Sequence, residues 1–167
     1  MPLPDGIELR RYESRDADAV RRLHALAVRR LAASHHTPAQ LAAHEALIMA
    51  DAYADDLARS NLLLAEARGG RLVATGGWLP HPDRPATARI RKVFVHPDLA
   101  GRGLGSAMVR AAEAAAHAAG LPNLFVRANI NAVRLYEKLG YRALEPGVMP
   151  AGLENLPVMF MERLAGL

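Results

Sequence analysis

Three glycines alternate in the stretch DLAGRGLGSAMV, which runs from Asp98 to Val109. They are Gly101, Gly103 and Gly105, and an apolar-periodic run that predicts a helix follows them directly. Glycine weakens both strands and helices, so three within five residues indicate positive φ angles or a close approach of the backbone to another group. The loop is therefore a tight turn, a nucleotide site or a site for another anion.

The helix behind the loop suggests which chemistry it offers. A helix N-terminus presents about four unpaired N–H groups and about half a positive charge, and glycines let an oxyanion approach them. Arg102 could add a charge-assisted contact. A P-loop would need Lys-Ser/Thr after Gly105, and the third glycine of a dinucleotide fingerprint would fall on Ser106 or Met108. A pyrophosphate fits, and from this loop alone a simple strand-to-helix turn is an equal alternative.

Length and composition indicate one domain over residues 1–167. The chain has 167 residues, 51% of them hydrophobic, which suits a single buried core. No apolar run approaches the roughly 20 residues of a membrane span, and the first residues lack the order of a signal peptide, so we expect a cytoplasmic protein. The absence of cysteine excludes disulfides, thiolate metal sites and a cysteine nucleophile.

The positive charge does not by itself indicate a nucleic-acid partner. The formal net charge is +4, but the basic residues are scattered and only Lys92 and Lys138 are lysines. A nucleic-acid-binding domain typically clusters its Lys and Arg on one surface. We therefore expect no nucleic acid and no membrane as partners, and keep nucleic-acid binding as the weakest alternative.

Hydrophobic periodicity and turn residues predict the elements that position the loop. Ser14 or Asp16 is expected to cap the first helix, and Thr37 and Pro38 to start the second. We expect strands at 7–12, 62–67, 71–79, 89–95, 123–128, 141–144 and 158–164, with further helices at 49–57, around 104–119 and at 131–140. The fold class is α+β, a central mixed sheet of about seven strands flanked by helices.

Two segments of this pattern together resemble the GNAT superfamily of acyl-CoA-dependent N-acyltransferases. VFVHPDLAGRGLGSAM, residues 93–108, is similar to the family's hydrophobic strand, V-x-P turn and Q/R-x-x-G-x-G/A pyrophosphate loop. NINAVRLYEKLGYRAL, residues 129–144, is similar to its N-x-x-A-x-x-x-Y-E-K-L-G-F/Y helix. The specific part of the resemblance spans residues 93–141. Ala100 departs from the family, which usually has Gln or Arg at that position.

The resemblance implies a GNAT-like, mostly antiparallel mixed sheet and acetyl-CoA as the acyl donor. It implies that the pantetheine arm runs beside one strand, that the glycine loop holds the pyrophosphate, and that an asparagine contacts the cofactor. The cofactor-binding residues would be Val93, Phe94, Val95, Gly101, Arg102, Gly103, Leu104, Gly105, Ser106, Asn129 and Tyr136. The alternative for Asn129 is a capping or strand-end role.

The resemblance also gives Tyr136 a catalytic role. A free thiol has a pKa of about 8.5 and a phenol one of about 10, so a tyrosine can protonate the departing thiolate. A backbone N–H of the strand at Val93 to Val95 would face the thioester carbonyl. The alternative for Tyr136 is an amphipathic residue with its ring in the core.

The base that deprotonates the amine is not evident from the sequence. Family members often carry Glu on or near the fourth strand, where this chain has Arg89, Arg91 and Lys92. Glu66, or a histidine before or within the second helix, is a candidate; these histidines are His35, His36 and His44. HEALI, residues 44–48, lacks the second His of HExxH, so we expect no metal.

The expected activity is transfer of acetyl from acetyl-CoA to a primary amine of a small molecule or peptide. Arg89, Arg91 and Lys92 would favour an acceptor with an anionic group over a polyamine, because like charges repel. The alternative is a catalytically silent CoA-binding module. Residues 143–164 are apolar enough for a homodimer contact or for the closing strands of the monomer.

Overall fold

The computed structural model describes residues 2–166, in which seven strands form one mixed sheet of order β1-β2-β3-β4-β5-β7-β6. The strands are β1 (Ile7–Arg11), β2 (Leu63–Ala67), β3 (Arg71–Pro80), β4 (Thr87–Val95), β5 (Asn123–Asn129), β6 (Arg142–Ala151) and β7 (Glu154–Arg163). The helices are α1 (Ala17–Leu31), α2 (Pro38–Met49), α3 (Ala52–Ala58), α4 (Leu104–Ala118) and α5 (Val133–Lys138). Only the β4–β5 pair is parallel; the other neighbours are antiparallel.

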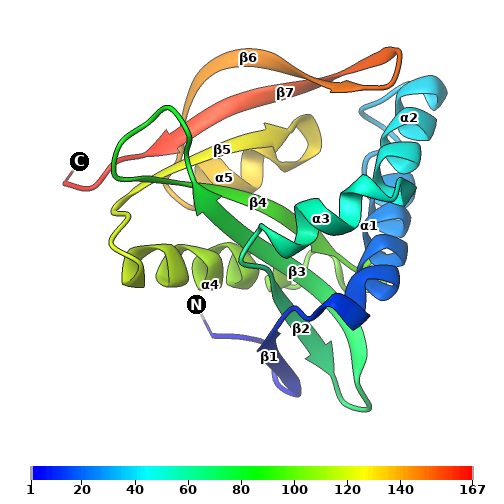
Figure 1. The fold of residues 1–167 in the computed structure, drawn as a ribbon, viewed down its shortest axis with the longest axis horizontal. Helices are drawn as coiled ribbons and strands as arrows, with labels where there is room; N and C mark the ends of the chain where they lie inside the picture. The colour runs from blue at the N-terminus through cyan, green and yellow to red at the C-terminus, as the bar shows by residue number, and fades with distance from the viewer. Residues whose placement is uncertain (1, 167) are drawn as a thin grey trace.

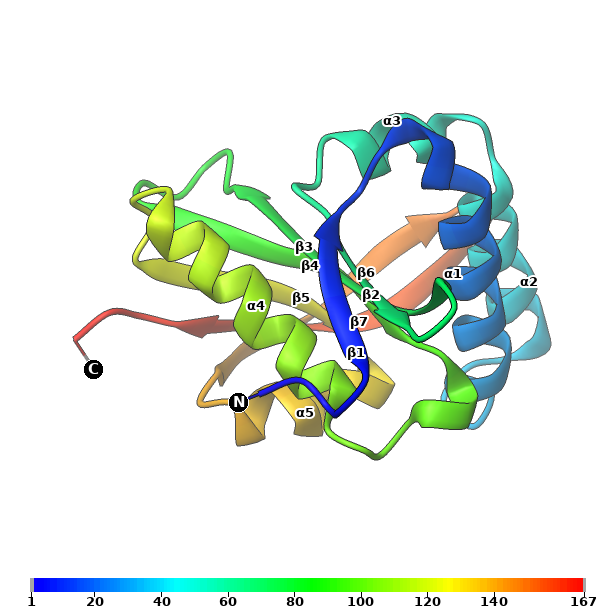
Figure 2. The ribbon, with the colours of Figure 1, turned by 90° about the horizontal axis from the view of Figure 1, so that it is seen from below.

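Helices cover both faces of the sheet. Figures 1 and 2 show α1, α2 and α3 on one side and α4 and α5 on the other. The core is divided accordingly: Val20, Ile48 and Leu57 pack on one face, while Val109 and Ala112 pack with Ile90 on the other. The predicted α+β class and the mixed, mostly antiparallel sheet of seven strands are confirmed.

The predicted starts of two helices differ from the structure in detail. Asp16 stands at the N-cap of α1, as predicted, but its side chain makes no capping hydrogen bond to the helix; it accepts from the backbone N–H of Glu13 and forms an ion pair with Arg10, beside a 3-10 turn at Ser14–Asp16. Met49 ends α2 rather than starting the next helix, and α3 begins at Ala52. Ala50 takes an extended backbone between the two helices, and alanine, as a strong helix former, gives no local signal for that break.

The strand β4 changes its pattern halfway along. It pairs with β5 only from Thr87–Asn123 to Ile90–Val126, so within residues 2–166 the ladder ends there although both strands continue. Its pairing with β3 shifts register between Thr75 and Gly77. Lys92 has a φ of 57°, which is uncommon for a residue with a side chain. The sheet therefore opens between β4 and β5 next to a β-bulge.

The bulge reverses the alternation of β4 side chains. Arg91 and Lys92 are sequence neighbours, yet both bond Asp56 on α3, so both side chains lie on the same face of the sheet. Gly77 opposes this region on β3, and a Cβ there would clash with the backbone carbonyl oxygen of Ser60. Glycine is required at that position because the chain approaches so closely.

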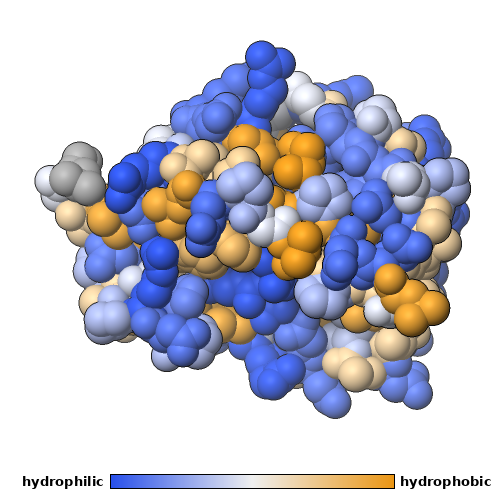
Figure 3. All heavy atoms as spheres, turned by 90° about the horizontal axis from the view of Figure 1, so that it is seen from above, coloured by the Kyte–Doolittle hydropathy of each residue, from blue (hydrophilic) through white to orange (hydrophobic). Residues whose placement is uncertain are grey.

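The closing segment forms the hairpin β6–β7, which completes the chain's own sheet. Leu144, Val148 and Leu153 remain exposed on it. Figure 3 shows that on the face seen from above the hydrophobic groups are separated by hydrophilic ones. The homodimer stays a prediction. No helix within the described residues is long and apolar enough to cross a membrane.

Candidate active site

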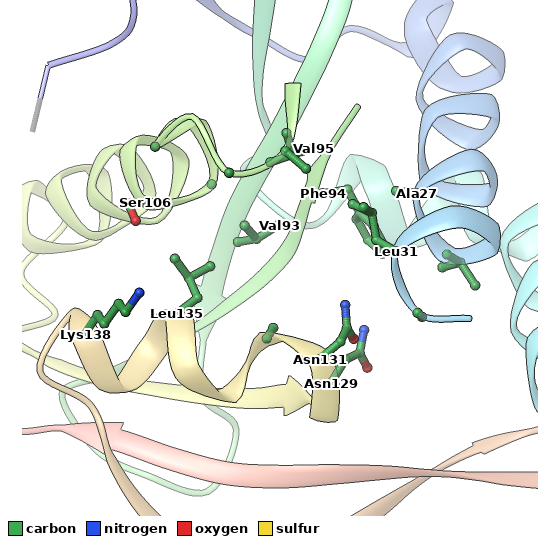
Figure 4. A pocket seen from close by; sticks show the side chains of 17 residues that line it. Ala27, Leu31, Val93, Phe94, Val95, Ser106, Asn129, Asn131, Leu135 and Lys138 are labelled. Carbon is green, nitrogen blue, oxygen red and sulfur yellow. The ribbon is translucent and has the colours of Figure 1, made fainter. Parts of the chain in front are cut away.

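A cleft of about 540 Å³ opens where β4 separates from β5. Its walls come from α1, β4, the loop before α4, the end of β5 and α5. In Figure 4, Leu135 points from α5 toward Val93, while the amides of Asn129 and Asn131 project toward Leu31. The predicted glycine loop and the predicted second motif therefore form two sides of one cavity.

The glycine loop has free donors at its helical end. Gly103 is the N-cap of α4 with a φ of 82°, and no side chain within the described part of the protein caps the helix there. Gly101 has a φ of 77°, and a Cβ on either glycine would point into open space. Both glycines are thus needed for their backbone angle, and the cavity in front of them is open to an oxyanion. The residues fit a pyrophosphate group on this observation.

The other predicted loop residues differ in what they present to the cleft. Ser106 and Gly105 line it, whereas the Leu104 side chain is buried in the core beside α4, which leaves only its backbone for a ligand. Arg102 is not among the lining residues. Ala100 does line the cleft. Because this chain has alanine where the family usually has Gln or Arg, the wall of the cleft is apolar at that point.

A second, smaller pocket of about 100 Å³ adjoins the cleft. The two share Val93, Phe94, Asn129 and Ala132, which stand around the opening between β4 and β5. Asn129 makes no side-chain capping hydrogen bond to the described 3-10 turn that follows it. Its amide is therefore not used for the capping role that the sequence also allowed.

Tyr136 lines the second pocket beside the shared residues. Its side chain is buried, and its ring packs edge-on against Tyr141 with centroids 5.3 Å apart. Burial, with a smaller contribution from the Glu113 carboxylate, raises the pKa of Tyr136 above the usual value for a phenol. The hydroxyl therefore stays protonated throughout the neutral pH range.

A buried chain of hydrogen bonds, which no sequence pattern predicted, holds the bulge. The Thr75 hydroxyl donates to the Lys92 carbonyl oxygen over 2.6 Å, so it must accept from His24 Nε2, 2.7 Å away. Burial lowers the pKa of His24 well below its usual value, so the ring is neutral and its Nδ1 accepts from the Tyr53 hydroxyl over 2.8 Å. The His24 ring also stacks on Phe94, with centroids 4.0 Å apart.

Only one of the histidines considered as a base reaches the second pocket. His44 lines it, and burial lowers the pKa of His44 to about 4, whereas His35 and His36 are not among its lining residues. Glu66 forms an ion pair with Arg10 on β1 and lies outside the pocket. In residues 2–166 no group of three or more His, Asp or Glu side chains is placed to hold a metal ion.

Comparison with known proteins identifies the family. The model of the acetyltransferase (GNAT) family matches residues 20–141, which is most of the chain. The protein therefore belongs to this family and is an acyltransferase of the N-acetyltransferase type, as the two motifs predicted. A search of curated protein sequences found no significant match.

Solved structures agree with this assignment. A GCN5-related N-acetyltransferase from Rhodopseudomonas palustris has 27% identity and a TM-score of 0.86, covering 98% of both chains. PaiA N-acetyltransferase from Thermoplasma acidophilum, solved with coenzyme A, has 14% identity and a TM-score of 0.76, covering 95% of this chain and 98% of that one. YncA from Salmonella typhimurium, solved with acetyl-CoA, has 20% identity and a TM-score of 0.65, covering 96% and 95%.

The hydrogen-bonded chain at the bulge predicts the effect of Thr75→Val. This substitution keeps the shape but leaves His24 Nε2 and the Lys92 carbonyl oxygen without their partner in a buried place. We expect the free energy of unfolding, measured by urea titration, to fall by about 1–3 kcal/mol. Thr75→Ser keeps the hydroxyl and is the matched control. Equal losses for the two variants would contradict the role given to the hydroxyl.

Proposed function

We propose that the protein transfers the acetyl group of acetyl-CoA to a primary amine of a small molecule or peptide. The observation that carries the proposal is the continuity of the two cavities: the cleft in front of the glycine loop meets the smaller pocket at the opening between β4 and β5. The donor would occupy the cleft and the acceptor the pocket. The reacting groups would then meet beside Val93, Phe94 and Asn129.

The chain's backbone would hold the donor. The first N–H groups of α4, after Gly103, face the cavity where a pyrophosphate would bind. Val93 to Val95 belong to the part of β4 that has no β5 partner among the described residues. The backbone groups on this edge can therefore hydrogen-bond the pantetheine arm, which would lie beside β4 in the manner of an added strand. An N–H on this edge is also the proposed donor to the thioester oxygen.

Tyr136 is proposed as the acid that protonates the departing thiolate. It lines the acceptor pocket, and its neighbours Ala132 and Leu135 line the donor cleft, so it lies close to the place where the two cavities meet. The hydroxyl is protonated at neutral pH, so a proton is available, although burial raises the pKa of Tyr136 and makes it a weaker acid than a free phenol. The support for this role is its position, since burial of the ring against Tyr141 is equally compatible with a core residue.

Lys92 is proposed as the group that accepts the proton of the amine. Its side chain is only 12% exposed, lies against the Tyr53 ring at 3.9 Å and bonds Asp56 Oδ2 over 2.7 Å. Burial lowers the pKa of Lys92 to about 8, although Asp56 raises it. A base works best when its pKa is near the working pH, which favours Lys92 over His44 at about 4.

Ligand-dependent stability tests the proposal first. Because a ligand that binds only the folded state raises the unfolding midpoint, acetyl-CoA and CoA should raise it and ATP should raise it little. Thiol release from acetyl-CoA with a panel of primary amines then measures turnover. A shift without any thiol release would favour the silent CoA-binding module, and no shift with saturating acetyl-CoA would refute both.

Tyr136→Phe removes the proposed acid. We expect kcat for thiol release to fall by about 100-fold, with an unchanged midpoint shift by acetyl-CoA. Tyr141→Phe is the control, because its hydroxyl bonds Glu113 and lies outside both cavities; it should lower stability but leave kcat near the wild-type value. Similar kcat losses in the two variants would show that Tyr136 acts through packing.

Lys92→Arg separates a base from a fixed charge. The wild-type kcat should rise with pH through an apparent pKa near 8, because the neutral amine of Lys92 is the active form. The arginine keeps the charge but stays protonated, so kcat should fall by at least about tenfold and lose this rise. Retention of the wild-type profile by Lys92→Arg would exclude Lys92 as the base.

A further inference from the structure

The smaller pocket, which we propose as the acceptor pocket, contains more positive charge than nearby acidic side chains neutralise. Four basic side chains line it, three from β4 and one from β5, and no Asp or Glu is among its lining residues. They are Arg89, Arg91, Lys92 and Arg127. His44 adds no charge at neutral pH, because burial lowers its pKa to about 4. Such a concentration of buried charge is unfavourable unless an anion enters.

Asp56 on α3 neutralises only part of this charge. Its Oδ2 accepts from Arg91 over 2.6 Å and from Lys92 over 2.7 Å, and its Oδ1 lies 3.7 Å from the exposed Arg59. One carboxylate balances one of these cations. In the part of the chain that the structure describes, no acidic side chain forms an ion pair with Arg89 or Arg127.

Arg89 and Arg127 stand on the two strands that separate. Arg89 pairs in register with Phe125, and Arg127 follows two residues later on β5, just past the last bridge at Ile90–Val126. Burial, with smaller contributions from the charges of Arg127 and Arg91, lowers the pKa of Arg89 to about 10. The pKa of Arg127 is lowered by its own burial and by Arg91. The guanidinium groups therefore repel one another across the opening.

Part of the hydrogen-bonding capacity of the two β4 arginines is also unused. Arg89 Nε is buried and has no hydrogen-bond partner among the described residues, and the same holds for Arg91 Nε. A planar guanidinium with free N–H donors suits the oxygens of a carboxylate or phosphate. The pocket, at about 100 Å³, encloses a small group rather than a whole large acceptor.

We propose that Arg89 and Arg127 form a subsite for an oxyanion, so that the acceptor carries a carboxylate or phosphate group near its reactive amine. The inference depends on the proposed acetyl transfer for the role of the pocket. The sequence already predicted an anionic acceptor from Arg89, Arg91 and Lys92. In the structure Arg91 and Lys92 are bonded to Asp56, so we assign anion binding to Arg89 and to Arg127, a residue that the sequence analysis did not consider. A polyamine would add a cation where charge is already in excess.

Anion-dependent stability measures the subsite without any need for turnover. The unfolding midpoint is recorded with malonate, with inorganic phosphate and with chloride at equal ionic strength, always in saturating CoA so that the glycine loop is occupied. Malonate or phosphate should raise the midpoint of the wild type above its value in chloride. The larger of the two shifts distinguishes a carboxylate from a phosphate.

Three variants assign the effect to the pocket. Arg89→Gln and Arg127→Gln should each lose most of the anion-dependent shift while keeping the shift caused by CoA, which also shows that they are folded. Arg68→Gln is the matched control, because Arg68 is exposed in the turn between β2 and β3 and should retain both shifts. An anion shift that is equal in all four proteins, or absent from the wild type, overturns the subsite.

Matched acceptors connect the subsite to the reaction. Glycine is compared with glycinamide, O-phosphoethanolamine with ethanolamine, and spermidine serves as the cationic acceptor. For the wild type, kcat/KM should be at least about tenfold higher for the anionic member of one pair, and Arg89→Gln should remove the difference. Preference for spermidine overturns the inference but leaves acetyl transfer intact, whereas absence of any CoA or acetyl-CoA shift refutes the proposed function itself.

Discussion

The site depends on the point at which β4 stops pairing with β5. Up to Ile90 and Val126 the two strands share a parallel ladder, and beyond it both continue without each other. Unpaired backbone groups inside a protein are unfavourable unless a partner satisfies them. The exposed edge of β4 therefore suits a ligand that bonds like a strand, and the same opening joins the cleft in front of the glycine loop to the smaller pocket.

The bulge at Lys92 makes this opening chemically useful. A positive φ at a residue with a side chain is strained and persists only where the surroundings hold it. Here the Thr75 hydroxyl holds the Lys92 carbonyl oxygen, and His24, from α1, holds Thr75. As a result Lys92 lies beside Arg91 at the smaller pocket, on the side of Asp56, instead of on the face of the sheet that α4 covers. One buried hydrogen-bonded chain thus links helices on one face to the charge pattern of the site.

The arrangement of charge in the smaller pocket is unfavourable for stability. Arg89 and Arg127 are half-buried near other cations, and burial lowers the pKa of each. A core built only for stability would place apolar residues or more acids there. Elsewhere the protein does balance its buried charge: Glu113 accepts from Tyr141 over 2.9 Å and is paired with Arg110 and Arg163 at 2.8 and 2.9 Å. The contrast supports the oxyanion subsite that we propose at Arg89 and Arg127.

The sequence by itself determined the fold class, the seven strands and the family, because periodicity and the two motifs around Gly103 and Tyr136 are local signals. It also located the helix N-terminus that faces the cleft. It could not reveal the bulge at Lys92, the hydrogen bond between His24 and Thr75, or the position of Arg127 in the smaller pocket. A reversal of side-chain alternation and a contact between residues 51 positions apart leave no periodic pattern in the sequence. Only the tertiary structure decided which basic side chains share a pocket, since that depends on where two strands diverge.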